Sequence, residues 1–137
     1  MTPPVFSEEW AMACGAALNQ NAAYREAARS WEGAVLLRLT PAGGPEDARL
    51  VYFDLWHGEC RAARAATPAD EALARYTMSG TAAAWQQVLT GGIAPLMALM
   101  TGRIRLTKGA LAELLPHVHA AKELVLTFAA VPATYPD

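Results

Sequence analysis

The sequence predicts one α+β domain in which helices are segregated from a run of strands. Three observations favour this class. Apolar residues recur at helical spacing towards both ends of the chain, they alternate with polar residues in the middle, and no repeat or linker divides the 137 residues. A chain of this length builds one hydrophobic core, so we treat residues 1–137 as a single domain.

The composition excludes several classes of protein. The net charge is -2 and charged residues make up 18% of the chain, which argues against the basic surface that nucleic acid requires. No apolar run approaches the roughly 20 residues of a membrane span, and the first residues lack the pattern of a signal peptide. Two cysteines, Cys14 and Cys60, do not suggest a disulfide framework, so we expect a cytoplasmic protein.

The first element is helical. Ser7 is a good N-cap, and apolar residues from Trp10 to Leu18 follow at helical spacing. The polar residues 19–21 interrupt this pattern before it resumes. Residues 7–31 are therefore predicted to form one broken helix or two consecutive helices.

The period then changes to two, which indicates strands. We expect loops at residues 41–47 and 67–71 and a tight turn at His57-Gly58. The short connections favour antiparallel pairing of these first strands. The predicted strands are residues 34–40, 49–56, 59–65 and 73–79.

The second half returns mainly to helical spacing. Thr81 begins a helix, Pro95 opens a shorter one, and a fifth strand over residues 103–108 returns to the sheet after this helical crossover. A helix marked by the apolar residues from Leu111 to Val118 follows and is expected to be broken or kinked at Pro116. A last helix is expected to run from Ala121 through Phe128.

The segment from Ile93 to Met100 has no polar face, because Ile93, Leu96, Met97, Leu99 and Met100 cover every side of a short helix. Two interpretations stay open. The helix is buried all round in the core, or it is the wall of an apolar cavity, a role that suits the adaptable methionines.

The run YTMSGTAAAWQQVLTGGIAP, residues 76–95, leads into a second run that ends at residue 109. Together they resemble the signature half of the sterol carrier protein type 2 family, in its bacterial stand-alone branch. The matching places are Gly91, Pro95, Gly102, Ile104 and Leu106.

This resemblance implies a five-stranded, mainly antiparallel sheet covered on one face by helices, with an apolar tunnel between them. It implies non-catalytic binding or transfer of a fatty acid, fatty acyl-CoA, isoprenoid or sterol-like ligand, with no metal and no cofactor. A transient membrane contact and a homodimer stay open, and no nucleic acid is expected as a partner. Arg103 and Arg105 are candidate headgroup contacts. The candidate tunnel residues are Trp85, Leu89, Ile93, Leu96, Met97, Met100, Ile104, Leu106, Leu111, Leu114, Leu115 and Val118.

Other functions are weighed against this one. An accessory or dimerisation module would use the apolar surface for a protein partner. An enzyme would need Cys60 as a nucleophile with His57 as its base. A metal site is disfavoured, because His117 and His119 point to different sides of a helix. Asp54 is expected to face solvent or to pair with an arginine on a neighbouring strand.

Overall fold

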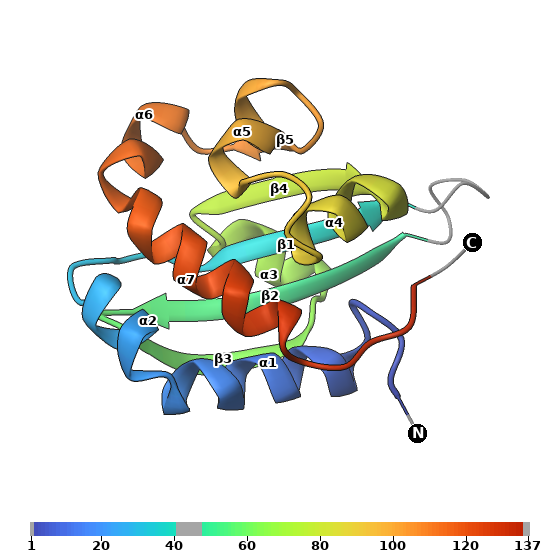
Figure 1. Ribbon diagram of the computed structural model, residues 1–137, viewed down its shortest axis with the longest axis horizontal. Helices are drawn as coiled ribbons and strands as arrows, with labels where there is room; N and C mark the ends of the chain where they lie inside the picture. Colours follow the sequence, from blue (N-terminus) through green and yellow to red (C-terminus); the bar gives the residue numbers. More distant parts are fainter. Residues whose placement is uncertain (1, 41–47, 136–137) are drawn as a thin grey trace.

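A five-stranded sheet is the centre of the molecule (Figure 1). The structure is a computed structural model that describes residues 2–40 and 48–135, so the loop predicted at residues 41–47 lies outside the described residues. The strands lie side by side in the order β3-β2-β1-β4-β5. Their bounds are β1 Val35–Thr40, β2 Arg49–Trp56, β3 Glu59–Ala65, β4 Tyr76–Thr81 and β5 Arg105–Lys108.

Most of the helices lie over one face of this sheet, whereas α3 lies behind it (Figure 1). On the covered face, α1 runs along β3 and α7 crosses β1 and β2. No helix in the described part of the chain is long and apolar enough to span a membrane. The helices are α1 Glu8–Gln20, α2 Ala22–Ala27, α3 Pro68–Leu73, α4 Ala82–Leu89, α5 Pro95–Met100, α6 Leu111–Leu114, the 3-10 turn η2 Leu115–His117 and α7 Val118–Ala129.

The pairing of the first strands confirms part of the prediction and corrects the rest. β1 pairs antiparallel with β2, and β2 pairs antiparallel with β3. β4, in contrast, lies parallel to β1, with Val35 opposite Tyr76. The expectation that all of the first four strands pair antiparallel is therefore wrong, and α3 is the reason, because it carries the chain across the back of the sheet from β3 to the free side of β1.

The loop predicted at residues 67–71 is mostly helix. Thr67 is the N-cap of α3 and Pro68 occupies its first turn, a position that tolerates proline. The Asp70 carboxylate accepts a hydrogen bond from the Thr67 backbone N–H at 2.9 Å and closes a capping box. Because α3 includes Leu73 as its last residue, the fourth strand begins at Tyr76 instead of residue 73.

Several local predictions are confirmed. The first helical segment divides at Asn21, whose side-chain oxygen accepts hydrogen bonds from Ala23 N–H and Tyr24 N–H. His57 and Gly58 form the hairpin turn, both with positive φ, at 52° and 84°. The chain also breaks next to Pro116, where η2 separates α6 from α7.

The alternation of the strands sorts the core into two clusters. The large cluster fills the covered face and includes Val35 and Leu37 from β1. The residue between them, Leu36, points to the other face and packs there with Tyr52 and Ala74. The main core therefore lies between the sheet and α1, α2, α4 and α7.

Candidate functional site: an apolar cavity

A cavity of about 110 Å³ lies inside the main core. Strands supply its floor, α7 with the turn before it supplies its roof, and α4 and α5 supply one side. The floor and the residues beside it are Val35, Leu37, Leu55, Met78 and Ile104. The roof is Leu114, His117, Val118, Ala120, Ala121, Leu124, Val125 and Phe128. The other lining residues are Phe6, Trp10, Tyr24 and Trp31 from the first part of the chain and Trp85, Val88, Leu89, Pro95, Leu96 and Leu99 from α4 and α5.

Local sequence rules explain this lining. Residues two apart on a strand share a face, so Val35 and Leu37 both reach the cavity. Residues three and four apart on a helix share a face, so Trp85, Val88 and Leu89 reach it together from α4. The sequence thus directs apolar side chains towards one space from elements that are far apart in the chain.

The polar atoms of two tryptophans in the wall are satisfied by the backbone. The Trp85 indole N–H donates to the Arg38 carbonyl at 2.8 Å, and the Trp31 indole N–H donates to the Gly33 carbonyl at 2.7 Å. These bonds hold both rings in place. They also leave the hydrocarbon faces of the rings, and not the N–H groups, to line the cavity.

Besides Trp10, with its indole N–H, two other lining residues carry groups that can form hydrogen bonds. His117 lies in η2 and meets the Trp31 ring edge to face, with 4.9 Å between the ring centroids. Tyr24 comes from α2 and is 1% exposed. Burial raises the pKa of the Tyr24 hydroxyl, so this group is neutral. Within residues 2–40 and 48–135, no Lys, Arg, Asp or Glu lines the cavity.

The structure brings one group of the predicted tunnel residues to the cavity wall. They are Trp85, Leu89, Leu96, Ile104, Leu114 and Val118.

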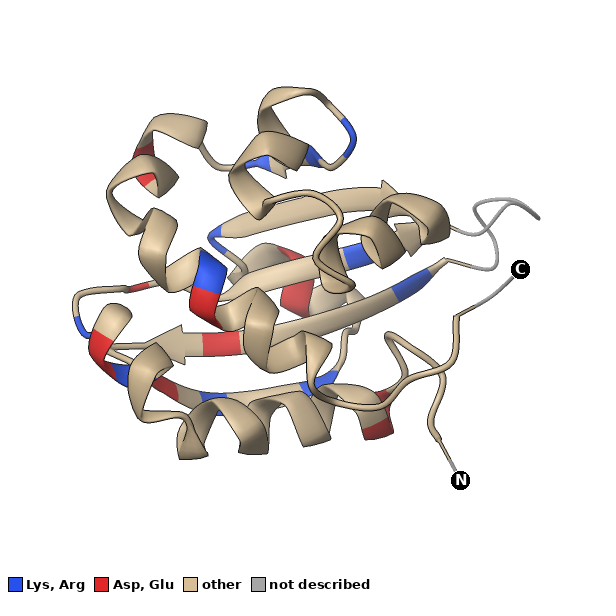
Figure 2. Cartoon of the chain, viewed as in Figure 1, with Lys and Arg blue, Asp and Glu red and all other residues tan. Residues whose placement is uncertain are grey.

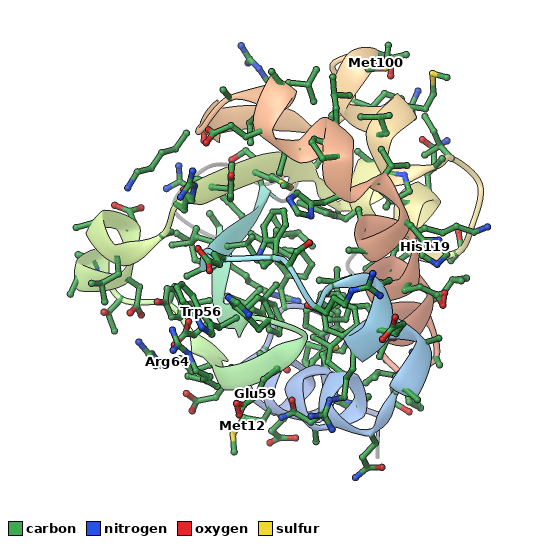
Figure 3. All side chains as sticks on the ribbon, turned by 90° about the vertical axis from the view of Figure 1, so that its left-hand side faces the viewer. Met12, Trp56, Glu59, Arg64, Met100 and His119 are labelled. Carbon is green, nitrogen blue, oxygen red and sulfur yellow. The ribbon has the colours of Figure 1, made fainter. Side chains whose placement is uncertain are left out.

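A second group of predicted tunnel residues lies elsewhere. Met97 and Met100 are 50% and 62% exposed, and Figure 3 shows Met100 at the outer end of the molecule. Leu115 is likewise exposed. The helix that we expected to be apolar on all sides therefore has one side towards the cavity and another towards solvent. The remaining three pack against the edge of the core without reaching the cavity, and they are Ile93, Leu106 and Leu111.

The wall also contains residues that were not predicted from the sequence, and they come from both halves of the chain. The alternating pattern of β1 was a usable signal for Val35 and Leu37. Nothing local distinguished Phe6, Trp10 or Tyr24 from ordinary core residues, because their role depends on tertiary packing.

Neither candidate headgroup contact lines the cavity. Arg103 is exposed, and its guanidinium donates a hydrogen bond to the Gln87 side chain. Arg105 is exposed on β5 and lies opposite Ser79 in the sheet. Both arginines thus lie outside the cavity wall, and any contact with a headgroup would have to be made at the surface.

The two residues of the alternative catalytic pair each have another hydrogen-bond partner. His57 Nε2 lies 2.6 Å from a Glu32 carboxylate oxygen, and the Cys60 thiol donates to the Ala62 carbonyl at 3.3 Å. Burial raises the pKa of Cys60 to about 11, which disfavours a reactive thiolate.

No three His, Cys, Asp or Glu side chains within the described ranges lie close enough to hold a metal ion. Asp54 pairs with Arg61, as expected.

The comparisons with known proteins decide the family. A family model described as the SCP-2 sterol transfer family matches residues 15–110. The chain belongs to this family. A search of curated proteins found no match.

Solved structures agree with this assignment to the sterol carrier family. A crystal structure of sterol carrier protein 2 is 44% identical, with a TM-score of 0.83 over 93% of this chain and 98% of that one. A solution structure from Thermus thermophilus, described as a possible sterol carrier protein, is 38% identical, with a TM-score of 0.84 over 98% and 97% of the two chains. Sterol carrier protein 2 from Yarrowia lipolytica is 15% identical with a TM-score of 0.61 over 87% and 88%, which shows the shared fold alone. This is a family of lipid carriers, generally without catalytic activity.

Proposed function

We propose that the protein binds an apolar lipid-class ligand in the cavity beneath α7 and carries it without chemical change. The observation that carries this proposal is the wall itself, which gathers apolar side chains from nearly every element and no charged residue among those described. A wall of this kind favours hydrocarbon and penalises ionised groups.

The energetics permit such binding. Burial of about 400 Å² of a lipid chain contributes about 10 kcal/mol at ~25 cal/mol per Å². Ordering and association cost several kcal/mol. The balance is enough for micromolar affinity without any polar contact.

The apolar wall favours ligands that consist mainly of hydrocarbon. Fatty acids, isoprenoids and sterol-like molecules have hydrocarbon to bury. The phosphates of a fatty acyl-CoA would have to remain outside, at the surface where exposed cations such as Arg103 and Lys122 lie. The buried free thiols of Cys14 and Cys60 suit a reducing compartment, and we propose the cytoplasm.

Two variants on the same helix test the site. Leu96 lines the cavity, so Leu96→Asp should abolish binding of a fluorescent fatty acid, because it places a carboxylate in the apolar wall. Met100 is on the solvent side of α5, so Met100→Glu is the matched control and should bind as the parent does. Equal binding by all three proteins would overturn the assignment of the cavity.

A second candidate function is an accessory or dimerisation module. The observation in its favour is the exposure of Met97, Met100 and Leu115, large apolar side chains that solvent ordinarily disfavours. Size-exclusion chromatography with light scattering tests it. A tight dimer that excludes fatty acids supports this module, and a monomer that binds them supports the lipid carrier.

A further inference from the structure

The Tyr24 hydroxyl is an exception in a well-satisfied core. Its oxygen is buried and has no hydrogen-bond partner among the described residues. The Tyr76 hydroxyl, in contrast, accepts a hydrogen bond from Arg75 Nε at 3.0 Å. An unpaired buried hydroxyl lowers the stability of a protein, so a phenylalanine would fill the same space at lower cost.

The position of Tyr24 connects this hydroxyl with the cavity. The Tyr24 side chain belongs to the cavity wall. The oxygen itself is enclosed by protein atoms. A cavity of about 110 Å³ has to widen before it takes a long chain, and Tyr24 is one of the wall residues that can move as it does so.

The chemistry of the wall limits what the hydroxyl can meet. The Tyr24 hydroxyl is neutral and both donates and accepts hydrogen bonds. No Lys or Arg side chain lies in the described wall to compensate an ionised carboxylate or phosphate. A neutral oxygen on the ligand is therefore the matching group, because it needs a hydrogen bond and no counter-charge.

We propose that Tyr24 is a specificity-determining residue whose hydroxyl forms a hydrogen bond with a neutral oxygen, a hydroxyl or a carbonyl, at the buried end of the lipid. This inference rests on the proposed function. It adds that the protein distinguishes lipids that bury such an oxygen from lipids of equal length that have none.

The test uses two probes of similar length, 1-dodecanol and 1-chlorododecane, of which only the first has a hydroxyl. Binding is followed by the fluorescence of the tryptophans that line the cavity. Tyr24→Phe removes one oxygen and should weaken binding of dodecanol about fivefold, the effect of one neutral hydrogen bond, and leave binding of chlorododecane unchanged.

Tyr52→Phe is the matched control. Tyr52 packs on the opposite face of the sheet, where the Arg64 guanidinium stacks over its ring. Figure 3 shows Arg64 on that side. This variant should bind both probes as the parent does.

The outcomes separate the two proposals. A selective loss of dodecanol affinity in Tyr24→Phe supports the role of the hydroxyl. Equal affinity of the parent and Tyr24→Phe for both probes overturns that role and leaves lipid binding intact. If neither probe binds the parent, the proposed function is overturned and this inference with it. A thermal unfolding midpoint that falls in Tyr24→Phe would show a structural role for the hydroxyl and would also overturn the proposal.

Discussion

Asp70 shows at the scale of one residue how a charge is accommodated in the structure. The side chain is 3% exposed and accepts hydrogen bonds from the Arg64 guanidinium, at 2.6 Å, and from Thr67. The Arg64 hydrogen bond, followed by the Thr67 backbone N–H, holds the pKa of Asp70 below its ordinary value. A depressed carboxylate pKa means that the ionised form stabilises the fold.

We therefore predict that Asp70→Asn lowers the free energy of unfolding at pH 7 by about 1–2 kcal/mol, because the charge-assisted bond to the partly exposed Arg64 is lost. The contribution is present above the unfolded pKa of about 3.9 and is lost as the pH falls through the lower folded value. Urea unfolding should show a constant difference between variant and parent from pH 7 to about pH 4, and a shrinking one below.

The control for this prediction is Asp54→Asn. Asp54 also pairs with an arginine, Arg61, but the Asp54 side chain is 26% exposed whereas that of Asp70 is 3% exposed. Its loss should cost less stability than the loss of Asp70. If the Asp70→Asn difference persisted undiminished in acid, packing rather than charge would be its cause.

At the scale of elements, the contact of α1 with β3 depends on a glycine. A Cβ added to Gly15 would lie 2.7 Å from the Ala63 Cβ and 3.2 Å from the Cys60 sulfur. Glycine weakens a helix by about 1 kcal/mol relative to alanine, so a helical glycine retained here indicates close packing. The absence of a side chain lets α1 lie directly against the strand.

Gly15→Ala is accordingly expected to lower the free energy of unfolding by about 1–2 kcal/mol despite the better helix propensity of alanine. The urea midpoint of the variant measures this. The double variant Gly15→Ala/Ala63→Gly should recover part of the loss, and Ala16→Ser, at an exposed neighbour, should have little effect. A Gly15→Ala protein more stable than the parent would contradict the close contact.

Elements were predictable where their signals are local. Three features follow from the residue types at a single position. Glycine permits the tight turn at His57 and Gly58, and the Asn21 side chain caps the helix that begins after it. Pro116 interrupts the helical segment because its ring nitrogen has no N–H. The parallel pairing of β1 with β4 does not follow from local signals, because it depends on the path that α3 takes behind the sheet. Leu73 looked like the start of a strand because a six-residue helix is too short to show a helical period.

At the scale of the whole molecule, the wall of the cavity contains some residues that the sequence identified as candidates and others that it did not. Leu96, Ile104 and Leu114 lie in the stretch that was unusually apolar, and they line the cavity. Trp10 and Tyr24 line it from the opposite end of the chain, where they look like any buried aromatic residue. Which side of α5 faces inwards was equally hidden, because all of its sides are apolar.

The proposed function requires part of this wall to move when a long lipid chain enters, and α5 is a weakly attached part of it. Of its residues only Ala98 is fully buried, and its N-cap Ala94 has no side-chain bond to the helix. Gly91 and Gly102, both at positive φ and without close neighbours, lie on either side of it. Neither α4 nor α5 carries a charged residue that would tie it to the rest of the surface (Figure 2).

Hydrogen exchange followed by mass spectrometry should detect this movement. Added palmitate should slow amide exchange in α5 and in the segment from η2 into the first turns of α7, because an apolar chain packs beneath both and stabilises their closed arrangement. The central strands β1 and β2 should change little, since each is paired with a strand on both sides. Leu96→Asp with palmitate is the control and should exchange as it does without lipid. Protection confined to the face that α3 covers would place the lipid on the wrong side of the sheet and contradict this path.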